Sequence, residues 1–380
     1  MRLVIQQPAL PHFRVPFFRE LARRPGLKTV LYYAESAGTP NAQPDGFEAR
    51  YEQQVCVRIL SGELLWHSAQ WRHLNRGEAD VACLSWNVRY LSLLPSLLRA
   101  RARGIPVVLW GHGRSKNETA PRRRLRSLLA SLGSALVFYN QRTADDYLVR
   151  GWARERVYVA PNSLDQAAIE NAIAAWAEKP EQLEAFRKMQ SLKKDYTLIY
   201  VGRIYKRGFD VLLAALARVR TKLPQVKLVV IGKLSEESRH LESLASELGL
   251  EGAVRWLGPL YDETQIAPWM LSATAMCFPR QIGLSLMHGM GYGLPVITDD
   301  DMDQHGPEIE ALRDGFNGRL YHRGSPESLA DIILQTLSDK RILANMSAAA
   351  KHTVETEYNM PKMADGFLGA VTYAARHCPR

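Results

Sequence analysis

The sequence predicts an α/β protein with two doubly wound, Rossmann-like parallel-sheet domains that face a cleft. Three observations support this prediction. Short apolar runs alternate with helical stretches, the alternation restarts near residue 198, and 380 residues are more than one hydrophobic core usually supports. Ligands of such sheets bind beyond the carboxyl ends of the strands, so the cleft between the domains is the expected site.

The first domain is expected over residues 1–165. Its strand candidates are the apolar runs 3–6, 29–33, 81–85, 107–110, 135–139 and 157–160. The helical stretches between them are 16–24, 89–103 and 121–132. A polar helical bridge over 166–194 follows and is expected to link the two domains.

The second domain is expected over residues 195–358. Its strand candidates are 198–201, 227–231, 254–257, 275–278 and 296–298. Its helical stretches are 209–222, 236–248, 262–271 and 284–292. The tail, residues 359–380, is expected to form a helix that packs back on the first domain.

The composition, 46% hydrophobic and 23% charged, is ordinary for a globular protein. The sequence contains no run of 18 or more apolar residues, which a membrane-spanning helix would need. The start of the chain reads as a first strand rather than a signal peptide. Four cysteines lie far apart without metal-ligand spacing, which argues against a disulfide framework and a structural zinc site. They are Cys56, Cys83, Cys277 and Cys378. We therefore expect a cytoplasmic protein.

The positive charge is unevenly distributed. The net charge is +10, and the first 150 residues hold 22 Lys and Arg against 11 Asp and Glu, so the excess lies in the first domain. Such a domain is expected to meet an anionic partner, which is a phosphate group, a nucleic acid or an acidic membrane. The sequence lacks an aromatic RNA-binding motif and a recognisable DNA-reading helix, which argues against nucleic acid.

Two leucine-rich basic segments, 89–103 and 121–132, are relevant to whether the anionic partner is a membrane. In the second, Leu125, Leu128, Leu129 and Leu132 recur at helical spacing behind a cluster of arginines. Such helices either lie on an anionic leaflet or turn a leucine stripe to the core and an arginine face to water. The charge asymmetry favours peripheral attachment to the inner face of the cytoplasmic membrane.

The clearest chemical signal follows the strand at 198–201. Gly202 ends the strand, and Arg203, Lys206 and Arg207 precede the next helix. Three cations at the carboxyl end of a strand suit a diphosphate, because Arg holds two oxygens in a fork while Lys acts as a point charge. The alternative is a solvated basic loop.

A second signal lies between Phe278 and Thr298. A strand leads through Gly283 into a helix rich in small residues, and backbone N–H groups near Leu284 and Ser285 would receive an anion. The glycines would let a ligand or the backbone come close. They could equally serve only the packing of helix on strand.

Together, in this order and spacing, these two segments resemble the retaining glycosyltransferases of family 4, which have the GT-B fold. The turn at 160–165 and the segment 306–318 continue the resemblance. It implies a nucleotide-sugar donor on the second domain, with Arg203 and Lys206 stabilising the leaving diphosphate. The spacing is one residue shorter than usual, so either Lys206 or Arg207 fills the role of the family lysine; we favour Lys206.

The sequence departs from the family at two glutamates placed eight residues apart, which Arg280 and His288 replace. The first glutamate normally contacts the hydroxyls of the donor sugar, and the second holds the ribose. His288 can still hydrogen-bond a ribose hydroxyl, whereas Arg280 favours an anionic or differently held sugar. The replacement also leaves room for a non-catalytic homologue that binds a sugar nucleotide or a glycan.

On the acceptor side, His112 follows the strand at 107–110 between two glycines. It matches a histidine that many family members place near the transferred sugar, where it orients the sugar or the acceptor hydroxyl. Arg114 and Lys116 are candidates for contact with an acceptor phosphate. His12 and Arg14 line the acceptor side or only pack a loop.

The sequence thus predicts a retaining glycosyltransferase that moves a sugar from a nucleotide-sugar donor to a glycan or lipid-linked acceptor in bacterial-type surface polysaccharide or lipopolysaccharide synthesis. A nucleotide-sugar epimerase of the same architecture is the nearest enzymatic alternative. The acidic run 299–303 invites a metal interpretation, but it lies where GT-B relatives place a metal-free loop. No cofactor and no essential metal are therefore expected.

Overall fold

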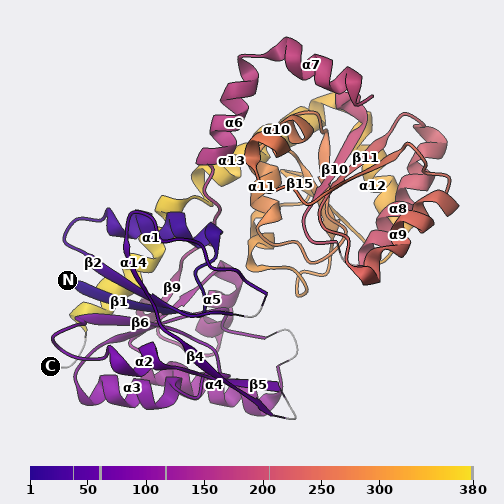
Figure 1. The fold of residues 1–380 in the computed structure, drawn as a ribbon. Helices are drawn as coiled ribbons and strands as arrows, with labels where there is room; N and C mark the ends of the chain where they lie inside the picture. Colours follow the sequence, from indigo (N-terminus) through magenta and orange to yellow (C-terminus); the bar gives the residue numbers. More distant parts are fainter. Residues whose placement is uncertain (37, 60–61, 116–117, 205, 378–380) are drawn as a thin grey trace. The chain divides into compact units, whose positions relative to one another are not determined.

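The computed structural model describes residues 1–36, 38–59, 62–115, 118–204 and 206–377. The chain forms two compact units (Figure 1). The N-terminal unit comprises Met1–Asp165 and Met360–Arg380, and the C-terminal unit comprises Gln166–Asn359. Each unit has a parallel sheet covered by helices on both faces, so each has the Rossmann-like layering that the alternation of elements predicts.

The N-terminal unit contains a seven-stranded parallel sheet in the order β3-β2-β1-β6-β7-β8-β9. Its central strands are buried on both faces, which explains why they read as continuous apolar runs. The strands are β1 (Arg2–Gln7), β2 (Lys28–Tyr33), β3 (Glu48–Tyr51), β6 (Val81–Ser85), β7 (Val107–Trp110), β8 (Ala135–Phe138) and β9 (Val157–Val159).

Two hydrophobic cores lie on the two faces of this sheet. In one, Phe17 of α1 and Phe367 of α14 pack against Trp110 with ring centroids 5.2 and 5.1 Å away. In the other, Trp86 packs on Phe138 and Tyr147. The helices are α1 (Val15–Ala22), α2 (Ser68–Arg72), α3 (Leu93–Ala102), α4 (Ala120–Leu132), α5 (Gln141–Val149) and α14 (Met360–Arg376).

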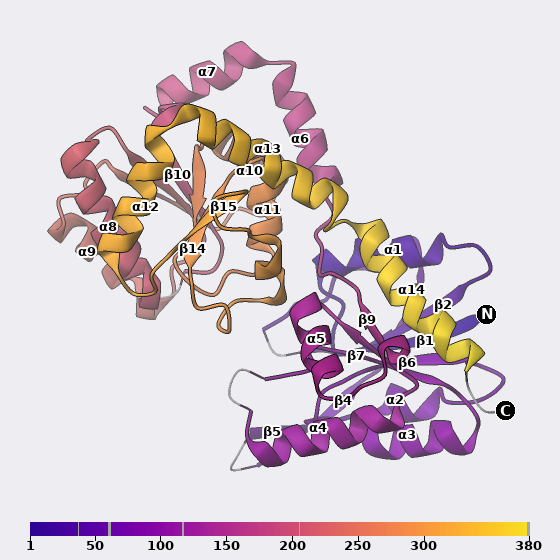
Figure 2. The ribbon, with the colours of Figure 1, turned by 180° about the vertical axis from the view of Figure 1, so that it is seen from behind.

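The C-terminal helix α14 belongs to the N-terminal unit, where it runs beside α1 (Figure 2). Its approach to β9 requires a glycine, because a Cβ on Gly366 would lie only 1.9 Å from the carbonyl oxygen of Val159. The last helix of the chain therefore packs directly on the last strand of the first sheet.

Three strands of the N-terminal unit were not expected from the sequence. They are the edge strand β3 and an antiparallel hairpin of β4 (Gln54–Ile59) and β5 (Gly62–His67). Polar residues interrupt all three, and Val55 and Trp66 are exposed, so no apolar run marks them.

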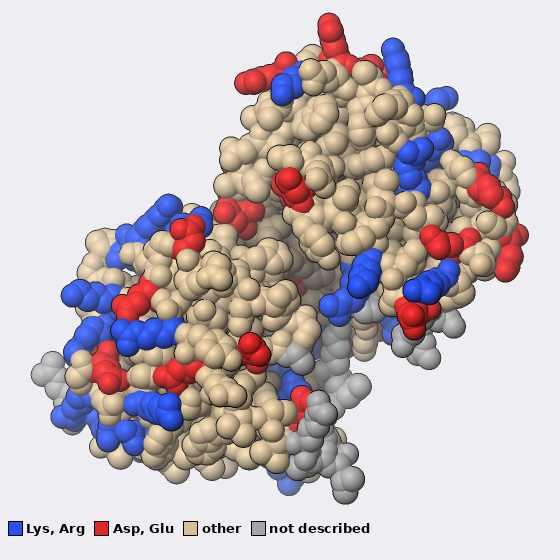
Figure 3. Space-filling view, in the orientation of Figure 1, with Lys and Arg blue, Asp and Glu red and all other residues tan. Residues whose placement is uncertain are grey.

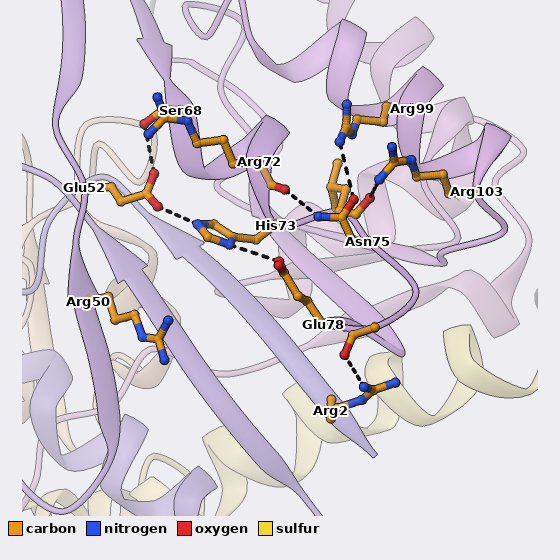
Figure 4. Close-up of polar contacts among 12 residues, drawn as sticks. Arg2, Arg50, Glu52, Ser68, Arg72, His73, Asn75, Glu78, Arg99 and Arg103 are labelled. Carbon is orange, nitrogen blue, oxygen red and sulfur yellow. Dashed lines mark hydrogen bonds and ion pairs between the residues drawn. The ribbon is translucent and has the colours of Figure 1, made fainter.

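A polar cluster connects this region to the sheet (Figure 4). Glu52, directly after β3, lies 2.5 Å from Nε2 of His73, and Glu78 lies 3.1 Å from Nδ1 of the same ring. The hydroxyl of Ser68 donates to the other oxygen of Glu52 at 2.9 Å, and Tyr32 of β2 stacks on His73. These side-chain hydrogen bonds thus add to the backbone pairing of β3 with β2 at the edge of the sheet.

The C-terminal unit contains a six-stranded parallel sheet in the order β12-β11-β10-β13-β14-β15. The strands are β10 (Thr197–Val201), β11 (Lys227–Ile231), β12 (Val254–Gly258), β13 (Ala275–Cys277), β14 (Val296–Asp299) and β15 (Gly318–Tyr321). The helices are α6 (Ala167–Ala177), α7 (Pro180–Met189), α8 (Lys206–Lys222), α9 (His240–Glu247), α10 (Glu263–Leu271), α11 (Ser285–Gly291), α12 (Pro326–Ser338) and α13 (Lys340–Thr356). Among the described residues of both units, the 3-10 helices are η1 (His12–Arg14), η2 (Arg154–Arg156), η3 (Lys194–Tyr196), η4 (Glu236–Ser238) and η5 (Pro307–Ala311).

The bridge over 166–194 differs from the expected linker. Its helices α6 and α7 belong to the C-terminal unit, and Phe186 of α7 packs edge-on against Trp269 of α10 with ring centroids 4.8 Å apart. Helix α6 and Phe186 of α7 pack against α10, so the segment is part of the second unit rather than a free connection. Among the helices of the described ranges, none combines the length and the apolarity needed to cross a bilayer.

Candidate functional sites

The candidate site of the C-terminal unit lies where the order of its strands reverses. β10 is followed by β11 and β12 on one side, and β13, β14 and β15 extend the sheet on the other. The loops after β10 and β13 therefore leave the sheet on either side of this reversal, which is where open α/β sheets bind ligands. Both of the motifs that the sequence singles out lie in these two loops.

The two loops touch each other. A Cβ on Gly202 would lie 2.8 Å from Cε2 of Phe278 and 3.4 Å from the hydroxyl oxygen of Ser285. A Cβ on Gly208, which has φ +103°, would lie 3.0 Å from Cβ of Arg280. Both glycines thus serve close packing, and this packing brings Gly202, Ser285 and Arg280 together as the sequence predicts.

The cations of this site are placed as follows. Arg203 is exposed directly after β10, and its carbonyl accepts a hydrogen bond from Tyr200. Lys206 and Arg207 open α8, but their side chains lie outside what the structure describes. Nε of Arg280 is buried and has no hydrogen-bond partner in the described ranges. Leaving a buried guanidinium N–H without an acceptor costs free energy.

Helix α11 begins at Ser285, with Leu284 as its N-cap residue. The first N–H of the helix to bond back is that of Leu286, which donates to Gly283 at 2.9 Å. The N–H groups of Leu284 and Ser285 thus precede the hydrogen-bonded part of the helix, as an anion site there requires. Their contact with a donor stays a prediction.

Buried polar residues hold the loop that carries Arg280 and Gly283. The N–H of Ile282 donates to Nδ1 of His305 at 3.1 Å, so the proton of the neutral ring is on Nε2, which donates to Asp299 at 3.0 Å. Glu308, also buried, lies against Gly283 and Gly306. The contacts of His305 with Ile282 and of Glu308 with Gly283 each join residues more than 20 positions apart, so no local pattern marks them.

The acidic run 299–303 is engaged with cations and with backbone N–H groups. Asp300 accepts from Arg323 N–H at 3.0 Å and lies 3.2 Å from His322, and Asp301 pairs with the guanidinium of Arg323. Across the described ranges, no three His, Cys, Asp or Glu side chains are grouped so that they could hold a metal ion.

His288 has a partner that the sequence did not suggest. Its Nε2 lies 3.0 Å from Oε1 of Glu263, at the start of α10, and Tyr292 donates to the same oxygen at 2.5 Å. Burial raises the pKa of Glu263, but the hydrogen bond and charge of His288 and the hydrogen bond of Tyr292 outweigh it, so the pKa is lowered overall. A carboxylate therefore lies beside position 288.

The candidate site of the N-terminal unit surrounds His112, which is exposed after β7. Its ring lies 4.7 Å from that of Tyr139. The flanking glycines are required by packing, because a Cβ on Gly111 would lie 2.8 Å from the Trp86 carbonyl oxygen and one on Gly113 would lie 2.5 Å from the Phe138 ring.

His112 lines a cavity of about 470 Å³, and Arg114 lines it too. Lys116 lies outside the described residues. His12 is exposed beside Phe13, whereas Arg14 is buried under the rings of Trp110 and Tyr139 and is not part of the cavity lining.

Comparisons with known proteins agree with this fold. Residues 181–353 match the family described as Glycosyl transferases group 1. The phosphatidyl-myo-inositol mannosyltransferase of Mycolicibacterium smegmatis is 28% identical over 223 residues, which cover 56% of this chain and 52% of that protein. The lipopolysaccharide core biosynthesis glycosyltransferase LpsE of Rhizobium meliloti is 28% identical over 172 residues, 44% of this chain and 47% of that protein. The chain thus spans about half the length of these relatives.

Among solved structures, Anabaena Alr3699/HepE in complex with UDP superposes with a TM-score of 0.72 at 17% identity, covering 98% of this chain and 99% of that one. This likeness shows the fold, and it confirms the expected GT-B architecture of two parallel-sheet units. The stretch that matches the group 1 model, residues 181–353, lies wholly within the C-terminal unit. The loops that carry Arg203 and Arg280, and helix α11, which carries His288, all lie within this stretch.

Proposed function

We propose that the protein is a retaining glycosyltransferase that moves a sugar from a nucleotide-sugar donor to a glycan or lipid-linked acceptor, in the assembly of surface polysaccharide or lipopolysaccharide. One observation carries the proposal. The loops after β10 and β13, which carry Arg203 and Arg280, touch at the reversal of the sheet within the stretch that matches the group 1 glycosyl transferases. Cations at that place suit the diphosphate of a sugar nucleotide.

In the proposed mechanism, Arg203 and Lys206 act on the leaving diphosphate. When the glycosidic bond breaks, the β-phosphate gains negative charge, and cations held beside it stabilise that charge more in the transition state than in the ground state. By the family resemblance, the departing phosphate accepts the proton of the acceptor hydroxyl. His112 orients the sugar or that hydroxyl on the acceptor side.

Thermal unfolding against UDP, GDP, dTDP, ADP and CMP tests the donor assignment. A nucleotide present at about 100 times its dissociation constant stabilises the protein by about 2.7 kcal/mol, which raises the midpoint visibly. UDP is the first candidate, because a solved structure of the same fold contains it. Sugar conjugates of the nucleotide that stabilises the protein most are then assayed for transfer. The anomeric configuration of the product tests whether the reaction is retaining. If none of the nucleotides raises the unfolding midpoint, the assignment of the donor site is wrong.

A second candidate, a non-catalytic protein that binds a sugar nucleotide or a glycan, is favoured by Arg280 and His288 at the positions of the two family glutamates. The same panel separates the two functions. Stabilisation by a sugar nucleotide with no transfer and no hydrolysis would favour the binder. Consumption of the donor that falls in Arg203→Ala would favour the enzyme.

We propose that transfer needs neither a metal nor another cofactor, since the carboxylates of the acidic run pair with His305, His322 and Arg323. The rate should be unchanged when divalent cations are removed with EDTA. A loss of activity that Mg²⁺ or Mn²⁺ restores would contradict this expectation.

We further propose attachment to an anionic membrane surface through α3 and α4, on the inner face of the cytoplasmic membrane. Both helices turn leucines outward as well as inward, with Leu98 of α3 and Leu128 of α4 more than half exposed. Lys and Arg side chains gather over the side of the unit where α3 lies (Figure 3). Exposed leucines beside arginines suit the interface of anionic lipids.

Flotation with vesicles tests the attachment. The protein should bind vesicles with phosphatidylglycerol and not those of phosphatidylcholine alone, and the double variant Leu98→Ser with Leu128→Ser should weaken binding. Equal binding of this variant would overturn the assignment to α3 and α4.

A further inference from the structure

The turn over residues 278–283 leads from β13 towards α11, and the two neighbouring strands anchor its first half. The hydroxyl of Thr298 in β14 donates to the carbonyl of Phe278 at 2.7 Å. The hydroxyl of Tyr321 in β15 donates to the carbonyl of Pro279 at 2.6 Å. Both hydroxyl-bearing residues are buried, so the turn leaves the sheet from a fixed position.

The second half of the turn is held by the segment that follows β14. The N–H of Ile282 donates to Nδ1 of His305 at 3.1 Å, and the carbonyl of Ile282 accepts from the N–H of Gly306 at 2.7 Å. Nε2 of His305 lies 3.0 Å from Oδ1 of Asp299, the last residue of β14, and both of these side chains are almost completely buried. The imidazole therefore links a carboxylate at a strand end to a backbone N–H of the turn.

Between these two anchored halves the backbone is strained. Gln281 has φ +55°, in the left-handed region that a side chain with a Cβ disfavours and that glycine adopts without cost. Strain of this kind persists only where the surrounding structure fixes the conformation, and it is concentrated at functional sites. Here the hydrogen bonds on either side of Gln281 fix it.

The conformation of Gln281 determines where Arg280 lies. Because φ and ψ are the only soft torsions of the backbone, a change of φ at Gln281 would turn Arg280 away from its position relative to Ile282. Arg280 is packed closely in that position, since a Cβ on Gly208 would lie only 3.0 Å from the Cβ of Arg280. A relaxed turn would therefore change the contact between the loops after β10 and β13.

We propose that His305, oriented by Asp299, is a positioning residue of the donor site, which keeps the turn in the strained conformation that places Arg280 for binding of the nucleotide. A neutral imidazole suits this role because it accepts a hydrogen bond at one ring nitrogen while it donates at the other. The inference rests on the proposed function, since it concerns the same donor site. It adds a residue that reaches that site only through the backbone of Ile282.

Titration calorimetry of the full chain with UDP, GDP, dTDP, ADP and CMP tests the role of the acceptor nitrogen. His305→Leu should bind the nucleotide that the parent binds most tightly at least about tenfold more weakly, which corresponds to 1.4 kcal/mol. His305→Asn offers an amide oxygen in place of Nδ1 and should stay within about threefold of the parent. Both variants remove the ring from Asp299, so their difference reports the hydrogen bond to Ile282. His322→Leu, an exposed histidine beside Asp300 of the same acidic run, is the control and should bind normally.

A second substitution separates positioning from a general loss of stability. Gln281→Gly removes the cost of the left-handed conformation, so it should raise the affinity of His305→Leu at least about threefold more than it raises the affinity of the parent. A histidine that only stabilises the fold would give the same factor in both backgrounds. Circular dichroism checks that each variant is folded.

Hydrogen exchange of the ligand-free chain tests the hold on the turn without a nucleotide. The peptide that contains Ile282 should exchange faster in His305→Leu than in the parent and in His305→Asn. Equal exchange, equal nucleotide affinities of His305→Leu and the parent, or an equal effect of Gln281→Gly in both backgrounds would overturn the inference and leave the donor site standing. A parent chain that binds none of the nucleotides would instead overturn the proposed donor site, and the inference with it.

Discussion

Nε2 of His288 lies 3.0 Å from Oε1 of Glu263, so the histidine that stands at the position of a family glutamate is itself bound to a glutamate from α10. Tyr292 donates to the same oxygen at 2.5 Å. A carboxylate that accepts from a histidine fixes which ring nitrogen carries the proton and how the ring is oriented. A carboxylate therefore lies beside position 288, and it comes from α10 rather than from α11.

The first prediction concerns Glu263. Because Glu263→Gln removes the charge and weakens the orientation of His288, it should weaken binding of the donor nucleotide by about 1 kcal/mol, or about fivefold, in a calorimetric titration. Glu247→Gln, an exposed carboxylate on α9, is the matched control and should bind normally. Equal affinities of the two variants would show that Glu263 only supports the packing of α10 on α11.

The second prediction concerns the leaving group. Arg203→Ala and Lys206→Ala should each lower the turnover about 10²- to 10³-fold, because each removes a cation that acts on charge developing in the transition state. Circular dichroism should show an intact fold, since Arg203 is exposed and contributes nothing to the core. Arg239→Ala, an exposed arginine near α9, serves as the control. Near-normal turnover in both variants would contradict the diphosphate assignment.

The sequence predicts the apolar framework well, because the central strands are buried on both faces. Strands 81–85, 107–110 and 227–231 lie where the apolar runs place them. The sequence did not predict the edge strands β3 and β15 or the hairpin β4–β5, because their residues are partly exposed and polar. The segment 166–194 was interpreted as a linker because its contacts with α10 join elements far apart in the sequence and leave no local pattern.

The sequence predicts only those parts of the candidate site whose residues are marked by their spacing from a strand end. Gly202, Arg203 and the loop from Arg280 to Ser285 follow strand ends, so their convergence follows from the parallel sheet. Glu263 lies 25 residues from His288, and His305 lies 23 residues from Ile282, so neither contact leaves a local pattern. Arg14 was expected either to line the acceptor side or only to pack a loop, and its guanidinium packs under aromatic rings that only the fold brings together.

The third prediction concerns the packing of the last helix. Gly366→Ala should destabilise the N-terminal unit by about 1–3 kcal/mol in urea unfolding, because the added methyl meets the backbone of β9, which cannot rotate away. This cost should exceed the gain of up to about 1 kcal/mol in helix propensity that alanine brings. Gly77→Ala, with nothing within 4 Å of the added methyl, should be close to neutral. If both variants have equal stability, α14 does not pack on β9 in solution.

The fourth prediction concerns Glu52 and acid. Burial raises the pKa of this carboxyl, but hydrogen bonds from His73 and Ser68 and the charges of His73 and Arg72 outweigh it, so the pKa is lowered overall. A carboxyl whose pKa is lower in the folded than in the unfolded chain stabilises the fold above its unfolded pKa. That stabilisation is lost as the pH falls through the folded value.

Glu52→Gln should therefore be less stable than the parent by about 1–2 kcal/mol in urea unfolding at pH 7, and the difference should shrink below pH 4. The matched control is Glu48→Gln, whose parent carboxylate is exposed and hydrogen-bonds only to the nearby Arg50 among the described residues. It should change the stability by less than about 0.5 kcal/mol, as exposed ion pairs do. A loss in Glu52→Gln that stays constant from pH 7 to pH 3 would mean that shape rather than charge holds the cluster together.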